Sequence, residues 1–151
     1  MPPEMHQAIQ AMLAMKTVAV VGLSDRPERP SHEVAEFLQG HGFRIVPVNP
    51  RHAGERILGE TCHATLREAA DAAAAAGAPI EWVDIFRRAE DTPGVVDEAI
   101  AIGARGVWLQ LGIVNDEAAA RAEAAGLKVV QDKCIKIEVM RLGIPPIDAD
   151  G

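Results

Sequence analysis

The sequence is poor in aromatic residues and has no tyrosine. Aromatic side chains make up 3% of the 151 residues, and the formal net charge is −7. Proteins that bind nucleic acids usually show a basic surface, and many add aromatic side chains that stack on bases. The composition therefore predicts that this protein does not bind nucleic acid.

Long hydrophobic runs and clustered cysteines are also missing. No apolar run approaches the roughly 20 residues that span a bilayer, and the first residues do not resemble a secretion signal. The two cysteines, Cys62 and Cys134, do not have the spacing of metal ligands. We expect no membrane association, no metal site, and reduced thiols in a cytoplasmic, soluble protein.

The sequence shows no catalytic constellation. Its five histidines are scattered, and neither Ser24 nor Ser31 has an evident base nearby in the sequence. His32 could approach a phosphate, but a solvated position at a helix start is the more common outcome. Cys134 is either a reactive thiol beside a helix start and a lysine or a small buried hydrophobe, and the second is more common.

Short apolar runs alternate with helical patterns along the chain. The runs are rich in Val, Ile and Leu and show little polar alternation, which is typical of strands buried on both faces of a parallel sheet. Strands joined by helices in this way form right-handed βαβ units. The predicted strands lie at residues 17–23, 44–48, 80–86, 105–111 and 127–131.

Helix-start signals separate these strands. Helices are predicted at about residues 4–15 and 133–142, and Ser31, Thr65, Thr92 and Asn115 are candidate N-caps for four more. The pattern predicts a single α/β domain over residues 1–142, with a five-stranded parallel sheet between two helical layers. Residues 143–151 are expected to form a flexible tail.

The loop "GLSDRPERPS" after the first strand has features of an anion site. Ligands of such sheets bind beyond the carboxyl ends of the strands, where Gly22 allows a close backbone approach. Arg26 and Arg29 add positive charge, and the helix that starts near Ser31 directs free N–H groups to the same place. The loop therefore predicts phosphate or nucleotide contact, and the alternative is a stiff surface turn.

The dinucleotide-binding fingerprint is absent from this loop. After the second strand, an NAD site would have an acidic residue for the ribose hydroxyls, whereas this chain has Asn49 and Arg51. An arginine suits a phosphorylated ribose better. The alternative for the Asn49-Pro50 pair is a simple turn.

The third strand ends in "DIFRR". Phe86 and Arg87 could cover an adenine or meet a phosphate, or they could be a core residue and a solvated cation. Asp84 and Gln110 lie among apolar neighbours, so each needs hydrogen-bond partners within the fold or in a ligand.

Seven segments together resemble a known family. "VVGLSDRPERPS", "PVNP", "LGE", "DIFRR", "VWLQLG", "NDEAAARAEAAG" and "DKCIKIE" occur in the order and at spacings like those of single-domain CoA-binding proteins. That family resembles the CoA-binding domain of the succinyl-CoA synthetase α subunit, and the similarity covers about residues 10–142. The resemblance implies a Rossmann-like domain that binds coenzyme A through Gly22, Ser24, Arg29, Ser31, Val48, Asn49, Pro50, Arg51, Ile85, Phe86 and Arg87.

Two functions remain open from the sequence. The first is a non-catalytic module that binds CoA or an acyl-CoA through the 3′-phospho-ADP moiety. The alternative is an enzyme, either an NADP-linked oxidoreductase or a subunit that processes acyl-CoA. The sequence also leaves open a homodimer or an unknown protein partner.

Overall fold

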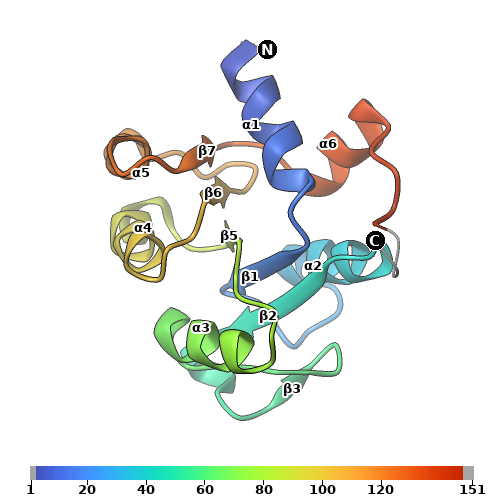
Figure 1. The fold of residues 1–151 in the computed structure, drawn as a ribbon. Helices are drawn as coiled ribbons and strands as arrows, with labels where there is room; N and C mark the ends of the chain where they lie inside the picture. The colour runs from blue at the N-terminus through green and yellow to red at the C-terminus, as the bar shows by residue number, and fades with distance from the viewer. Residues whose placement is uncertain (1–2, 148–151) are drawn as a thin grey trace.

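The chain folds around a parallel sheet with helices on both sides (Figure 1). The computed structural model describes residues 3–147. The five strands lie in the order β2-β1-β5-β6-β7, and every pairing is parallel. The strands are β1 (Thr17–Val21), β2 (Arg44–Val48), β5 (Trp82–Ile85), β6 (Gly106–Leu109) and β7 (Lys128–Val130).

Two layers of helices cover the sheet (Figure 1). One layer holds α1 (Pro3–Leu13), α2 (Pro30–Gly40) and α6 (Ile135–Leu142). The other holds α3 (Leu66–Ala75), α4 (Thr92–Ala101) and α5 (Asp116–Ala124). The predicted α/β class, the five-stranded parallel sheet and the Rossmann-like three-layer arrangement are confirmed.

Successive strand residues face opposite layers, which explains the continuous apolar runs. Val20 and Trp108 belong to the core beneath α1, α2 and α6. Val21 and Leu109 belong to the core on the other face, beneath α3, α4 and α5. Both faces of the sheet are buried. A polar side chain on either face would therefore need a hydrogen-bond partner inside the protein.

Two of the four predicted N-caps are confirmed. Thr65 accepts a hydrogen bond from the N–H of Glu68, and Asn115 accepts one from Ala118. The predictions for the other two helices are wrong. Helix α2 starts at Pro30 after the N-cap Arg29, because the Ser31 hydroxyl is used within the preceding loop. Helix α4 starts at Thr92 itself, whose hydroxyl donates to the Ala89 carbonyl.

The sequence did not predict a small hairpin next to β2. Strands β3 (Arg56–Ile57) and β4 (Glu60–Thr61) pair in antiparallel fashion. Two single-turn 3₁₀ helices, η1 (Pro50–His52) and η2 (Ala89–Asp91), were also not predicted. Elements of two or three residues are too short to show a hydrophobic period.

The chain after α6 returns to the end of α2. Gly143 ends α6 in the left-handed conformation, and the Ile147 N–H then donates to the His41 carbonyl at 2.8 Å. His41 Nε2 lies 2.9 Å from the Ile144 carbonyl oxygen. Residues 143–147 of the expected tail thus contact α2, and its last residues, 148–151, lie outside the described part of the chain. Within residues 3–147, no helix has the length and apolar character needed to cross a bilayer.

Candidate ligand-binding site

Three loops meet at the carboxyl edge of the sheet. They follow β1, β2 and β5, which are neighbours in the sheet. The chain passes from β1 to β2 on one side and later to β5 on the other, so strand order reverses beside β1. Ligands of open α/β sheets bind at such a switch point.

Gly22 allows the loops after β1 and β5 to lie against each other. Its N–H donates to the Val48 carbonyl at 2.8 Å, and the Phe86 N–H donates to the Val21 carbonyl at 2.9 Å. Gly22 has φ of +87°, and a Cβ atom there would lie 2.1 Å from the Phe86 carbonyl oxygen. The glycine is therefore required by the neighbouring loop, in addition to any ligand.

A cavity of about 620 Å³ opens above these loops. We call it the polar cavity. Seven of the eleven predicted contact residues line it: Gly22, Ser24, Arg29, Ser31, Asn49, Arg51 and Phe86. Its other lining residues are Asp25, Arg26, Pro30 and His52.

Short side chains fix the shape of these loops. Ser31 Oγ accepts from the Ser24 N–H at 3.0 Å, and Ser24 Oγ accepts from the Arg26 N–H at 3.1 Å. Asn49 Nδ2 donates to the Leu23 carbonyl, and Asn49 Oδ1 accepts from the Arg51 N–H, both at 3.0 Å. Asn49 is thus the turn residue that the alternative predicted, and it also joins the two loops.

Positive charge gathers at the polar cavity although the whole chain is acidic. Arg26, Arg29 and Arg51 are exposed and, among residues 3–147, have no acidic partner. Within residues 3–147, no side-chain hydrogen bond caps α2, and the residues at its start, Arg29, Pro30 and Ser31, line the polar cavity. Free guanidinium groups and an uncapped helix N-terminus together favour an anion.

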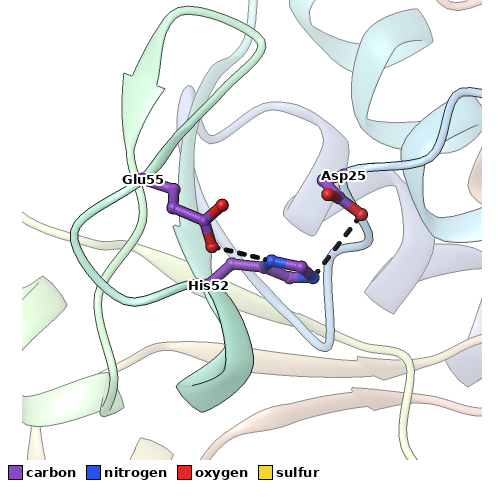
Figure 2. Close-up of side chains that lie close together, drawn as sticks. All are labelled: Asp25, His52 and Glu55. Atoms are coloured by element: carbon purple, nitrogen blue, oxygen red, sulfur yellow. Dashed lines mark hydrogen bonds and ion pairs between the residues drawn. The ribbon is translucent and has the colours of Figure 1, made fainter.

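His52 bridges two carboxylates at the rim of the polar cavity (Figure 2). Its Nδ1 lies 2.9 Å from Glu55 Oε2, and its Nε2 lies 3.5 Å from Asp25 Oδ1. The carboxylates approach opposite nitrogens of the ring. One ligand atom from each of these three side chains lies within 4.8 Å of the other two, so the group could also hold a metal ion. They tie the loop after β1 to the hairpin.

A second cavity of about 920 Å³ adjoins the first. We call it the apolar groove. Pro30, Arg51 and Phe86 line both cavities, so the two are adjacent. The remaining lining residues of the groove are Val34, Arg87, Arg88, Asp91, Gln110, Leu111, Ile113, Cys134 and Ile137.

A buried pair of polar side chains lies behind the groove. Gln110 Nε2 donates to Asp84 Oδ1 at 2.6 Å, and Asp84 Oδ2 has no hydrogen-bond partner in the described part of the chain. Burial raises the pKa of Asp84 well above its usual value, although the hydrogen bonds from Gln110 and the Ile85 backbone act in the opposite direction. The pair joins the end of β5 to the segment after β6.

The remaining predicted residues lie apart from the polar cavity. Arg87 lines the apolar groove. Val48 and Ile85 are buried in their strands, and Pro50 borders a small pocket with Val48 and Arg87. His32 is 7% exposed and its Nδ1 has no hydrogen-bond partner among the residues that the structure describes, so the expectation of a solvated position is wrong.

Two apolar residues of the groove were not indicated by the sequence, whereas Cys134, which also lines it, was considered there. Leu111 and Ile137 are large apolar residues in exposed positions of the groove. A single apolar residue on a surface is common, so neither stands out without the fold. Cys134 is half-buried at the N-cap of α6 and faces the groove, which differs from the fully buried position that is more common for cysteine.

The chain is similar to several known proteins over nearly its whole length. It is 38% identical to the uncharacterized protein YneT of Bacillus subtilis over 135 residues, which are 89% of this chain and 93% of YneT. A hypothetical protein from Pyrococcus horikoshii has a TM-score of 0.81 at 34% identity and covers 94% of this chain and 96% of its own. The Thermus thermophilus protein cell-free ID.343 has a TM-score of 0.78 at 35% identity, with coverages of 91% and 98%.

The family comparison agrees with the resemblance found in the sequence. The CoA binding domain family matches residues 16–140, which include all five strands of the parallel sheet and the three loops of the polar cavity. The chain therefore belongs to the CoA-binding domain family.

Proposed function

We propose that this protein binds coenzyme A across both cavities as a non-catalytic module. Family membership indicates CoA as the ligand. The observation that supports the binding mode is that a basic cavity adjoins a more apolar groove at Pro30, Arg51 and Phe86. CoA has the same two parts, a phosphorylated nucleotide and a long, weakly polar pantetheine arm.

The polar cavity would hold the 3′-phospho-ADP part. The diphosphate would lie at the uncapped start of α2 beside Arg26 and Arg29. Arg51 lies after β2, where an NAD-binding protein has an acidic residue for the ribose. A guanidinium at this position suits the 3′-phosphate, since arginine forms charge-assisted hydrogen bonds with phosphate oxygens.

The apolar groove would hold the pantetheine arm. Asp84 engages the amide nitrogen of Gln110, which leaves the amide oxygen of Gln110 available to an N–H of the ligand. Pantetheine carries two amide groups, so it can supply that donor. Cys134 faces the same groove and would lie beside the arm.

A binding role suits the side chains of the polar cavity better than a catalytic one. In the described residues, both nitrogens of His52 face carboxylates, and no hydrogen bond joins His52 to a serine. The hydroxyl oxygens of Ser24 and Ser31 accept hydrogen bonds from backbone N–H groups within the loop. A serine nucleophile needs a base within hydrogen-bond reach, and neither serine has one.

Calorimetric titration with CoA, dephospho-CoA and NADPH tests this function. CoA should bind about tenfold or more tightly than dephospho-CoA, because a hydrogen bond to a charged group contributes about 1.5–3 kcal/mol. NADPH should bind more weakly than CoA. Equal affinities for CoA and dephospho-CoA would contradict the assigned 3′-phosphate site, and saturable NADPH binding without a CoA response would favour the oxidoreductase alternative.

Variants with reversed charge locate the 3′-phosphate. Arg51→Glu should weaken CoA binding by about a hundredfold and dephospho-CoA binding by much less, since it replaces an attraction with a repulsion. Arg44→Glu is the matched control because Arg44 is also exposed but lies at the opposite end of β2. It should leave both affinities unchanged.

A further inference from the structure

Exposed apolar side chains are concentrated beside the apolar groove. The large hydrophobic residues that the described chain exposes are Leu111, Val114, Ile137 and Met140, at 62%, 46%, 53% and 69%. All four come from two short segments, residues 111–114 after β6 and residues 137–140 in α6. Leu111 and Ile137 line the groove directly.

The groove is also large for the arm alone. Its volume of about 920 Å³ exceeds the 620 Å³ of the polar cavity, although the nucleotide is the bulkier part of CoA. Ligand pockets usually measure about 300–1,000 Å³, so the groove lies near the upper end of that range. Apolar groups of Val34, Ile113 and Cys134 add to its wall.

We propose that the apolar groove also holds the acyl chain of a fatty acyl-CoA, so that the preferred ligand is a thioester with a medium or longer chain. This inference rests on the proposed CoA-binding function. A CoA thioester joins its acyl chain to the end of the pantetheine arm, and the groove runs on from the polar cavity that would hold the other end. The chain would therefore lie against Leu111 and Ile137.

The shape and charge of the groove favour a tethered chain over a protein surface. Two of the four exposed apolar side chains, Leu111 and Ile137, line a concave space beside a basic cavity, which suits a chain attached to CoA. Arg87, Arg88 and Asp91 occupy the lining together with the apolar residues. An aliphatic chain can lie along the apolar side and leave these charges hydrated.

Calorimetric titration with CoA, acetyl-CoA and octanoyl-CoA tests the acyl site. Burial of each methylene group is worth roughly 0.8 kcal/mol, or about fourfold in affinity when burial is complete. Because the groove is partly open, we expect octanoyl-CoA to bind at least about tenfold more tightly than acetyl-CoA. Equal affinities for the two thioesters would overturn the acyl site and leave CoA binding intact, whereas the absence of any CoA binding would overturn the proposed function itself.

Polar variants distinguish the groove from nonspecific apolar contact. Ile137→Ser and Leu111→Ser should each reduce the preference for octanoyl-CoA over acetyl-CoA severalfold, and any loss of contact with the pantetheine arm cancels in this ratio because both thioesters carry the arm. Met140→Ser is the matched control, because Met140 lies on the same helix, is at least as exposed, and does not line the groove. If Ile137→Ser instead leaves the preference unchanged and converts a dimer to a monomer in light scattering, the surface is an interface between copies and the proposal is wrong.

Discussion

The polar cavity and the apolar groove share three lining residues but are built differently. Loops after β1, β2 and β5 form the polar cavity, and hydrogen bonds of Ser24, Ser31 and Asn49 hold those loops together. The groove adds the start of α6 and the segment after β6, whose apolar side chains are partly exposed. The polar cavity is therefore held in shape by hydrogen bonds between its loops, whereas the groove is lined in part by exposed apolar side chains.

Polar groups also have different roles in the two cavities. In the polar cavity the arginines have no acidic partner among the described residues and remain available to an anion. Behind the groove, Asp84 and Gln110 satisfy each other in part and are buried. The first cavity therefore keeps its charges for a ligand, whereas the second uses a buried polar pair to orient one amide.

The largest expected effect comes from breaking the loop contact beneath the polar cavity. Gly22→Ala places a Cβ atom against the Phe86 carbonyl oxygen and also strains a positive φ. We expect the free energy of unfolding to fall by about 3 kcal/mol or more, with loss of CoA binding. Urea denaturation and calorimetry measure the two effects.

Gly54→Ala separates the clash from the backbone strain. Gly54 has φ of +86°, nearly that of Gly22, but its Cβ position is open. The free energy of unfolding of Gly54→Ala should fall only by the roughly 1–2 kcal/mol that a non-glycine residue costs in the left-handed conformation. Equal losses at the two positions would mean that contact with Phe86 contributes nothing.

The two cysteines allow the groove to be compared with the protein interior. Cys62 is 1% exposed, and burial is the main cause of its raised pKa. Cys134 faces the groove. Iodoacetamide should therefore modify Cys134 on the order of a hundredfold faster than Cys62, since alkylation needs an accessible thiolate.

Saturating CoA should slow this alkylation. If the pantetheine arm lies in the groove, it covers Cys134 and reduces the rate severalfold, as mass spectrometry of the intact protein would measure. ADP is the matched control because it lacks the arm and should protect much less. Unchanged labelling of Cys134 in saturating CoA would place the arm elsewhere.

The buried carboxyl behind the groove predicts a pH-dependent stability difference. Because the folded state raises the pKa of Asp84, its stabilising contribution is complete below about pH 4, the pKa of an unfolded aspartate. That contribution is lost as pH rises through the folded pKa. The Asp84→Asn side chain is uncharged at every pH. The free energy of unfolding of this variant should therefore exceed that of the native protein by about 1–3 kcal/mol at pH 7 and by little at pH 4.

Denaturation by urea at the two pH values measures this difference. After Asp84→Asn, the amide oxygen of residue 84 can still accept from Gln110 Nε2, so the substitution keeps this hydrogen bond. Asp71→Asn is the control, since Asp71 is exposed on α3. A stability change at Asp84→Asn that is the same at pH 4 and pH 7 would contradict ionisation as its cause.

Sequence periodicity predicted the sheet because its strands are buried on both faces. The five predicted strands all occur, with ends shortened by up to two residues. The caps at Thr65 and Asn115 were also predictable, since each hydroxyl or amide serves the helix that follows it directly.

Long-range contacts account for most of what the sequence did not predict. Ser31 does not cap α2 because its hydroxyl bonds to Ser24, seven residues earlier. The order of strands in the sheet brings residues 30, 51 and 86 to one cavity. Their spacing along the chain does not predict that they lie together. The groove was harder still to predict. Leu111 and Ile137 line it together, but α5 and β7 lie between them in the sequence.

The smallest expected effect is the response of the two cavities to salt. Raising ionic strength from about 0.01 M to 0.15 M shortens the screening length from roughly 30 Å to 8 Å, so CoA binding at the exposed arginines should weaken severalfold. Contacts between an acyl chain and the groove are not screened, so the affinity ratio of octanoyl-CoA to acetyl-CoA should stay constant. Calorimetry at the two ionic strengths measures both quantities, and replacement of Arg26 and Arg29 by glutamine should flatten only the CoA response. A ratio that falls with salt in parallel with CoA affinity would mean that the same charges control both cavities, and the distinction between them would be wrong.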